Sequence, residues 1–595
     1  MFSPPVKDMM FTLNDIVEIA ELTNFEIFAE AGSDVVEAIL DECAKLMRDE
    51  IAPMNAIGDR VEAKFEDGTV TYPPGAIEAW KNVQELGLVG LASEVEFGGG
   101  GMPQSVFAPV QEMLCGANLA FAQLPSLTIG AAEAIAAHGS DELKEKYLHK
   151  LVSGEWGGTM NLTEPQAGSD VGALTTKAVK ADDGTYRIQG QKIYITCGEH
   201  DLTDNIVHLV LARLEGAPEG TRGISLFLVP KFIVDNDGNY DIRNDLRCVS
   251  IEHKMGLKGS CACTMAYGDN GECVGYLIGE ENKGLMAMFT MMNTVRLHVG
   301  LQGVGCAERG YQQALHYASE RVQGTPVGGD GSKATIINHA DVRRMLMTMK
   351  ARTEAARAIN YMNGKAIDMA HASRGNAQGK YWRTLSDVLT PLSKAYGTDM
   401  GVAVVDDAVQ VHGGMGFIEE TGIAQIYRDV RITPIYEGTN GIQSWDLANR
   451  KLKMDGGEGI KGLLSEIKAF AEEKLNGDLS SMKPSLLSAV DAALDVSNWF
   501  LEMHGQNARA VAAGSVPYQR LMSETVGAWL LAKGALKAQD RIAAGDSDTK
   551  FLTSKIVTAQ FFAQRLLPVS TALASTIKTG DELLFALDEQ QLGLA

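Results

Sequence analysis

The chain has 595 residues, with 53 Lys and Arg against 76 Asp and Glu, and a formal net charge of −23 at pH 7. A chain of this length forms several domains or one large core, so a single small module is excluded. The acidic balance argues against nucleic acid or an anionic membrane as the main partner, because both attract basic protein surfaces.

The first predicted domain is helical and covers residues 1–158. Apolar side chains recur at intervals of three and four in DVVEAILDECAKLMRDEIAP and IEAWKNVQELGLVGL, the spacing of amphipathic helices. The run FGGGGMP at 97–103 predicts a flexible loop, since no GK[ST] follows to complete a phosphate-binding loop. The start of the chain shows no secretory signal, and no apolar run is long enough to span a membrane.

Residues 159–282 are predicted to form a β domain. The segments YRIQGQKIYIT, NIVHLVLARL and GISLFLVPKF alternate or run apolar and β-branched, with the turn signals ADDG and DNDG between segments.

Long helical patterns return over residues 283–452 and predict a helical bundle, interrupted by the loop GTPVGGDGSK at 324–333. The run GGEG at 456–459 indicates a linker to an additional helical domain at 460–595. We therefore expect an α+β fold in which a β domain is inserted between helical domains.

Eight cysteines are present, and none of them forms a CxxC pair. The close pair Cys261 and Cys263 lacks a second pair of ligands at the spacing of a zinc site. We expect reduced thiols, no bound metal and a cytoplasmic protein.

Two segments of the β domain have the composition of a flavin site. In MNLTEPQAGSDVGALTTKA at 160–178, Thr163, Ser169 and nearby backbone N–H groups can donate hydrogen bonds to a heterocycle or an anion. In IYITCG at 193–198, strand alternation places Tyr194 and Thr196 on one face. An aromatic surface beside a hydroxyl suits a flavin ring, and clefts at domain junctions often bind cofactors.

Competing sites have weaker support. The run GVGCAERG at 303–310 misses the G-x-G-x-x-G spacing and lies in a helical pattern with no preceding strand, which argues against a dinucleotide site. No G-x-S-x-G is present to form a hydrolase nucleophile elbow. His412, in QVHGGMGF, fits a packed or loop histidine better than a catalytic base.

Glu437 is the candidate general base. It lies between Tyr436 and Gly438 in RITPIYEGTNGIQ, an apolar stretch that is predicted to turn sharply. Partial desolvation there would make the carboxylate more basic than in water. From this peptide alone, a surface charge or a helix-start residue is the alternative.

Five motifs in order carry a resemblance to the acyl-CoA dehydrogenase family over about residues 35–450. They are LTEPQAGSD at 162–170, KMGLKGS at 254–260, QVHGGMGF at 410–417, YRDVRI at 427–432 and IYEGTNGIQ at 435–443. The resemblance implies FAD as cofactor and a fold of helical domain, β domain and four-helix bundle. It also implies formation of a trans Cα=Cβ double bond in an acyl-CoA thioester.

In this family a carboxylate removes the α proton while the β hydrogen leaves as hydride to flavin N5, and the resemblance puts Glu437 in the role of that base. Val295 stands where some relatives instead carry the base. Ser169 and Arg296 match positions near the acyl-CoA, although a helix-surface ion pair is the alternative for Arg296. Glu164 and Asp170 are interpreted as structural hydrogen-bond acceptors.

The resemblance also implies FAD contacts, which fall into a flavin-ring set, a diphosphate and adenine set, and a residue after the base. These residues are Leu162, Thr163, Ser169, Tyr194 and Thr196; then Arg321, Gln410, Gly413 and Gly414; then Thr439. Gly324 and Gly441 depart from the residues common in the family and weaken the adenine-side assignment. Because Arg321 would reach a neighbouring subunit's cofactor, we expect a homodimer or a dimer of dimers.

The start MFSPPVKDMMFTLNDI and the SERVQG loop resemble a bacterial branch of the family that acts on 3-methylmercaptopropionyl-CoA in dimethylsulfoniopropionate breakdown. That likeness implies methylthioacryloyl-CoA as product and electron-transferring flavoprotein as electron acceptor. The alternatives are a short- or medium-chain acyl-CoA substrate, or an acyl-CoA oxidase that uses O₂. A DNA-protective flavin-binding relative would need a basic C-terminal surface, whereas residues 451–595 hold 15 Lys and Arg against 17 Asp and Glu.

Overall fold

The structure is a computed structural model and describes residues 2–594. The chain divides into two compact units. The β-sheet unit comprises residues 42–102 and 113–298, and the helical unit comprises residues 2–41, 103–112 and 299–594. Three of the four boundaries fall within α2 (Ser33–Leu46), α5 (Gln104–Ala117) and α8 (Gly284–Glu320), and the fourth, between residues 102 and 103, precedes α5.

The main sheet of the β-sheet unit has the strand order β10-β11-β5-β12-β7-β6-β3, with β4 paired to β5 and β6. Only β3 and β4 run parallel to β6, and the other pairs are antiparallel. The strands are β3 (Trp156–Asn161), β4 (Lys177–Lys180), β5 (Tyr186–Thr196), β6 (Asn205–Leu214), β7 (Ile224–Pro230), β10 (Leu246–Ile251), β11 (Ala262–Tyr267) and β12 (Val274–Ile278). The strands predicted for YRIQGQKIYIT and NIVHLVLARL are confirmed as β5 and β6.

Helices precede this sheet in the chain, as the apolar spacing predicts, and α6 packs on β3. They include α3 (Ala52–Val61), α4 (Ala76–Glu85), α6 (Gln123–His138) and α7 (Asp141–Val152). A small hairpin of β1 (Lys64–Glu66) and β2 (Thr69–Thr71) interrupts the predicted helical region. Its three-residue strands are too short to produce a recognisable alternation. A second hairpin pairs β8 (Phe232–Ile233) with β9 (Ile242–Arg243).

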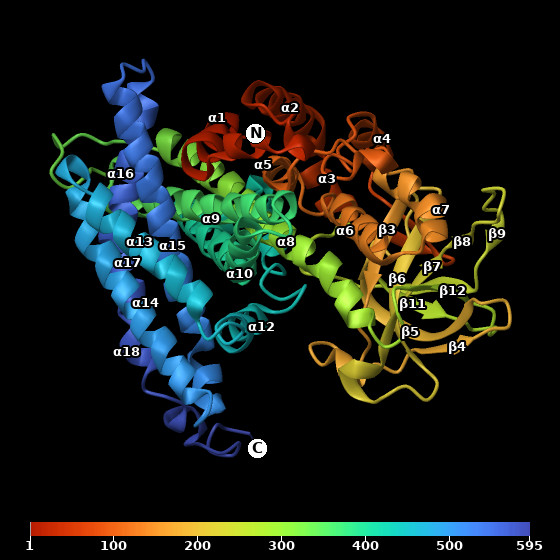
Figure 1. The fold of residues 1–595 in the computed structure, drawn as a ribbon. Helices are drawn as coiled ribbons and strands as arrows, with labels where there is room; N and C mark the ends of the chain where they lie inside the picture. The colour runs from red at the N-terminus through yellow and green to blue at the C-terminus, as the bar shows by residue number, and fades with distance from the viewer. Residues whose placement is uncertain (1, 595) are drawn as a thin grey trace. The chain divides into compact units, whose positions relative to one another are not determined.

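The helical unit contains long antiparallel helices (Figure 1). They are the C-terminal part of α8, α9 (Ala340–Ala372) and α10 (Ala377–His412), followed by the short α11 (Ile423–Val430) and α12 (Asn440–Trp445). The predicted break near GTPVGGDGSK is confirmed, because residues 321–339 separate α8 from α9.

Helices α8 and α10 cross with their backbones in close approach at glycines. A Cβ on Gly303 would lie 2.2 Å from the carbonyl oxygen of Gly397, and a Cβ on Gly397 would lie 2.5 Å from that of Gly300. Gly303, the first residue of GVGCAERG, therefore lies at a close helix crossing and not in a phosphate-binding turn.

We expect Gly303→Ala to destabilise the protein by about 1–3 kcal/mol, because the added methyl group meets backbone atoms that have no rotamer to change. The matched control is Gly462→Ala in α13 (Glu458–Lys474), where a Cβ meets no heavy atom within 4 Å. There the substitution should be neutral or stabilise by up to about 1 kcal/mol, through helix propensity alone. Urea unfolding of both variants measures the difference, and equal effects would contradict the close-crossing explanation.

The additional C-terminal domain is helical, as predicted, and packs on the bundle through α15 and α9 (Figure 1). Its helices after α13 are α14 (Lys483–Met503), α15 (Ala508–Ala543), α16 (Thr549–Phe561), α17 (Leu567–Thr571) and α18 (Leu573–Ile577).

The N-terminal segment, residues 2–24, joins this domain to the bundle. Asp15 pairs with Arg541 of α15 at 2.9 Å, and Glu21 pairs with Lys365 of α9 at 2.7 Å. Phe11, at the end of α1 (Val6–Phe11), packs edge-on against Phe551 of α16. Residues more than 500 positions apart in the sequence thus share one core.

Among residues 2–594, no helix is both long and apolar enough to cross a lipid bilayer.

Candidate functional site

The two predicted flavin segments lie side by side in the β-sheet unit. The turn after β3 carries Leu162 and Thr163, both half-buried, while Ser169 is exposed further along the turn. The backbone N–H of Ile193 in β5 donates to the carbonyl oxygen of Thr163 at 2.9 Å. This bond places Thr163 beside the strand that carries Tyr194 and Thr196.

Tyr194 lies in a bulge of β5. Ile195 pairs with Cys263 and Lys192 with Met265, so β5 has one more residue than β11 in this interval. Tyr194 has φ of 58°, and the residue is 60% exposed. Bulges re-aim side chains near functional sites, and this one presents the aromatic ring at the surface. Sequence alternation alone gives no signal of it.

This surface fits the flavin of FAD. Tyr194 offers an exposed aromatic side chain, and Thr163, Thr196 and Ser169 offer hydroxyl groups that can bond to a polar ring edge. Such a donor set suits a planar heterocycle with alternating donors and acceptors.

Arg296, the candidate acyl-CoA contact, lies on α8 and is 5% exposed. Its guanidinium carbon lies 5.8 Å from the centroid of the Phe289 ring, which is about two helix turns earlier. The alternative of a helix-surface position is wrong, because packing of α8 buries the side chain. Val295 beside it is buried as well.

Glu437 occupies a left-handed turn in the helical unit. Its φ is 57° and that of Gly438 is 84°. Left-handed backbone is uncommon for residues other than glycine and is typical of strained functional positions. The sharp turn predicted for IYEGTN is confirmed, and Glu437 is half-buried within it.

Buried polar groups anchor this turn. The ammonium of Lys394 in α10 donates to the carbonyl oxygen of Thr433 at 3.0 Å and to the side-chain oxygen of Asn440 at 2.8 Å. The Asn440 amide in turn donates to Asp399 at 2.7 Å. Residues on both sides of Glu437 are therefore fixed to α10, so the carboxylate projects from a rigid support.

Thr439, predicted as a cofactor contact, is the N-cap of α12, and its hydroxyl accepts a hydrogen bond from the Ile442 N–H at 3.2 Å. We expect Thr439→Ala to lower the free energy of unfolding by about 0.5–2 kcal/mol. Thr439→Ser should keep most of the stability that the cap contributes, because serine also caps helices. Urea unfolding of the two variants measures the difference, and equal losses would show that the cap is dispensable.

The adenine-side candidates lie on the surface of the helical unit. Arg321 follows the last residue of α8 and is exposed, as are Gln410 of α10 and Gly413 and Gly414 after it. Gly413 has φ of 60°, and a Cβ on either glycine would meet no heavy atom within 4 Å. No other part of the described chain therefore covers the surface at these two glycines.

His412 is a packed histidine, as predicted. Its Nδ1 lies 2.7 Å from the carbonyl oxygen of Ala408, and its ring stacks on Tyr317 with centroids 4.5 Å apart. Burial lowers the pKa of His412, so the imidazole is neutral at pH 7.

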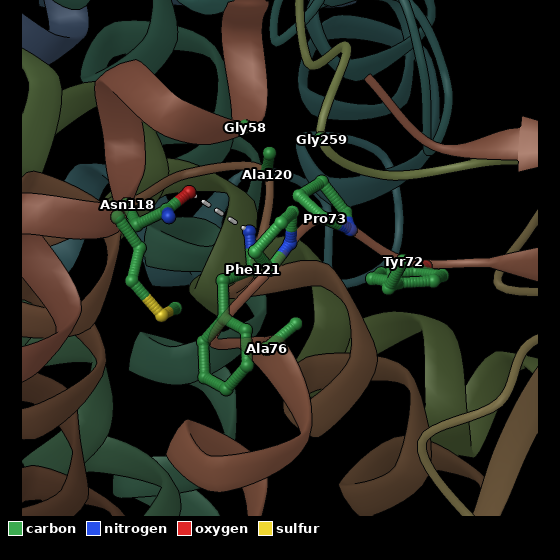
Figure 2. A pocket seen from close by; sticks show the side chains of 10 residues that line it. Gly58, Tyr72, Pro73, Ala76, Asn118, Ala120, Phe121 and Gly259 are labelled. Atoms are coloured by element: carbon green, nitrogen blue, oxygen red, sulfur yellow. Dashed lines mark hydrogen bonds between the residues drawn. The ribbon is translucent and has the colours of Figure 1, made fainter. Parts of the chain in front are cut away.

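A small cavity in the β-sheet unit is not the cofactor site (Figure 2). It is lined by Gly58, Tyr72, Pro73, Asn118 and Phe121 among others and measures about 20 Å³. That volume holds about one water molecule. The Asn118 side-chain oxygen accepts from the Phe121 N–H at 3.1 Å at its edge.

No group of three or more His, Cys, Asp or Glu side chains within residues 2–594 is arranged to hold a metal ion. All eight cysteines are buried and free of disulfides.

Comparisons with known proteins agree with this architecture. Models of the acyl-CoA dehydrogenase N-terminal, middle and C-terminal domains match residues 33–155, 159–269 and 282–452, and an "acetyl-CoA dehydrogenase C-terminal like" model matches residues 463–588. The chain is 44% identical to 3-methylmercaptopropionyl-CoA dehydrogenase of Ruegeria pomeroyi, over 98% of this chain and 99% of that protein. It is 36% identical to a butyryl-CoA dehydrogenase of Syntrophomonas wolfei, over 98% of each chain.

A solved acyl-CoA dehydrogenase of Bacillus anthracis in complex with FAD has a similar fold. The TM-score is 0.75 at 23% identity, with 100% of this chain and 95% of that chain covered.

The chain belongs to the acyl-CoA dehydrogenase family. It is an acyl-CoA dehydrogenase, and the resemblance and the fold class predicted from the sequence are confirmed, including the additional C-terminal helical domain.

Proposed function

We propose that the substrate is 3-methylmercaptopropionyl-CoA and the product is methylthioacryloyl-CoA. The observation that carries the proposal is the 44% identity to the Ruegeria pomeroyi dehydrogenase, which extends over 98% of this chain and so includes the additional C-terminal helices. The N-terminal sequence and the SERVQG loop support the same branch.

In the proposed reaction Glu437 is the catalytic base. The α proton moves to its carboxylate, and the electron pair of the broken Cα–H bond forms the Cα=Cβ bond. Bound FAD supplies the acceptor for the β hydrogen, which leaves with its electron pair as hydride. The backbone N–H of Glu437 polarises the thioester carbonyl, so that the developing negative charge is stabilised. The rigid left-handed turn supports this role, because a base must be held in fixed geometry.

The residues proposed to hold the cofactor fall into three groups. For the flavin ring they are Leu162, Thr163, Ser169, Tyr194 and Thr196; for the diphosphate and adenine, Arg321, Gln410, Gly413 and Gly414; beside the base, Thr439. Ser169 and Arg296 are proposed to contact the acyl-CoA. The exposed Ser169 hydroxyl and Tyr194 ring, with the half-buried hydroxyls of Thr163 and Thr196, support the assignment of the first group.

The proposed assembly is a homodimer or a dimer of dimers, in the cytoplasm, with electron-transferring flavoprotein as acceptor. Exposure of Arg321, Gly413 and Gly414 on a single chain supports a role for them at a neighbour's cofactor. Phe417, an exposed aromatic residue beside these glycines, supports an interface there.

Anaerobic titration of the purified holoenzyme tests the proposal. We expect 3-methylmercaptopropionyl-CoA to bleach the flavin absorbance at lower concentration and faster than butyryl-CoA. The reverse order would favour a short-chain substrate, the second candidate, which the 36% identity to the Syntrophomonas enzyme supports. Reoxidation by air as fast as by electron-transferring flavoprotein would favour an oxidase.

A further inference from the structure

A buried ion pair connects the two segments of the proposed flavin site. Glu164 lies in the turn after β3 and Lys192 lies in β5, with the ammonium nitrogen 2.8 Å from a carboxylate oxygen. The side chains are 2% and 0% exposed. A buried pair of this kind is costly to desolvate, so its presence beside a cofactor surface requires an explanation.

Glu164 is fully occupied by protein donors. One oxygen accepts from the Thr176 N–H at 3.1 Å, from the Thr176 hydroxyl at 2.6 Å and from Lys192. The other accepts from the Thr175 N–H at 2.7 Å, from the Thr175 hydroxyl at 2.8 Å and from the Gln166 amide at 2.7 Å. An ionised carboxylate has about four lone-pair sites, so no capacity remains for a ligand.

Lys192 extends the connection to the flavin segment itself. Its ammonium also donates to the carbonyl oxygen of Leu162 at 3.0 Å. The next residue of β5, Ile193, donates to the carbonyl oxygen of Thr163 at 2.9 Å. The peptide groups of Leu162 and Thr163 are thereby held on β5 next to the bulge that presents Tyr194.

Both members of the pair are charged at pH 7. Burial by itself would raise the pKa of Glu164, but the Lys192 charge and the hydrogen bonds outweigh it and lower the pKa to about 2. Burial lowers the pKa of Lys192 to about 8, against the attraction of Glu164. Removal of either partner therefore leaves an uncompensated buried charge, which displaces the segments that the pair joins.

We propose that Glu164 and Lys192 are positioning residues for the flavin, which hold Leu162 and Thr163 in register with Tyr194 and Thr196. The proposal rests on FAD binding by these two segments and is independent of which acyl-CoA is the substrate. It assigns to Glu164 a role beyond that of a structural acceptor, because the donors around its carboxylate fix the group that holds Lys192, and Lys192 in turn holds Leu162.

The test compares Glu164→Gln and Lys192→Met with a control in the same unit. The control is Lys231→Met, which breaks the buried pair of Lys231 with Glu199 beyond the end of β7. The holoenzymes are diluted, free FAD is followed by its fluorescence, and the visible spectrum and the reduction potential of the bound flavin are recorded. We expect a tenfold or greater increase in the FAD dissociation constant, and a changed spectrum and potential, for the first two variants. The control should change the FAD dissociation constant by less than twofold and keep the wild-type spectrum and potential, while it loses similar thermal stability.

The proposal is overturned if Glu164→Gln binds FAD like the wild type, with the same spectrum and potential, while its thermal stability falls. If that variant does not fold, Thr176→Val removes only the hydroxyl bond at 2.6 Å. An unchanged spectrum, potential and FAD affinity there would likewise overturn it. No acyl-CoA enters these measurements, so a negative result leaves the proposed substrate untouched. Failure of both acyl-CoA compounds to bleach a normally bound flavin would reject only the proposed function.

Discussion

Glu437→Gln is expected to lower the rate of flavin reduction by acyl-CoA by about 10²–10⁴-fold, the usual contribution of a positioned general base. Glutamine has nearly the same shape and preserves the turn, but it cannot take the α proton. Anaerobic stopped-flow measurement at 450 nm with saturating substrate isolates this step from reoxidation.

The control for this variant is Glu420→Gln, an exposed carboxylate elsewhere in the helical unit. It should reduce its flavin at the wild-type rate. Glu437→Gln should retain bound FAD and the wild-type flavin spectrum, since the substitution leaves the anchors at Lys394 and Asn440 in place. Bleaching at the wild-type rate in Glu437→Gln would reject this residue as the base.

Arg357→Met is expected to lower the free energy of unfolding by about 3–5 kcal/mol, the cost of leaving buried charge unpaired. The guanidinium is 1% exposed and lies 2.6 Å from an oxygen of Glu112 and 2.8 Å from an oxygen of Glu308. The Tyr361 hydroxyl completes the cluster with a bond of 2.7 Å to Glu112. The cluster joins α5, α8 and α9, so its loss weakens the helical unit at its centre.

The pH dependence of this variant follows from Glu112, whose pKa is already raised by burial despite Arg357. An acid with a raised pKa in the folded state favours folding when protonated, so stability falls as pH rises toward that pKa. Arg357→Met should therefore be more destabilised at pH 8 than at pH 5. Urea unfolding at both values measures this, and Glu112→Gln combined with Arg357→Met should recover part of the loss. A loss that is equal at both pH values would contradict the buried-charge explanation.

Much of the fold can be predicted from the sequence, because it depends on local patterns. The period of two in NIVHLVLARL and the period near 3.6 in the long helices depend on which side chains are apolar over one or two turns. The helical, β, helical order and the additional C-terminal helices follow from such patterns. Glu437 can be selected as a candidate base because it and the turn that holds it lie within one short peptide, but that peptide also fits a surface charge or a helix-start residue, and the resemblance to the family is what puts Glu437 in the role of the base.

The candidate site is only partly predictable, because some of its features depend on contacts between segments that are distant in the sequence. Thr163, Tyr194 and Thr196 can be selected by residue type and Leu162 from the resemblance, but the bulge that presents Tyr194 depends on the pairing of β5 with β11. The burial of Arg296 likewise depends on what packs against α8, and an isolated helical pattern leaves a surface ion pair equally possible.

The long helices and strands, their order and the chemical groups available in each follow from the amino-acid sequence alone. Which groups meet depends on the folding of the whole chain: Glu164 meets Lys192 across 28 residues, Arg357 meets Glu112 across 245, and the N-terminal segment meets α15 across more than 500. An apolar face must be covered and a buried charge must be paired, but neither specifies which partner does so. Partners are selected by packing of the whole chain, where the cost of a buried unpaired charge acts.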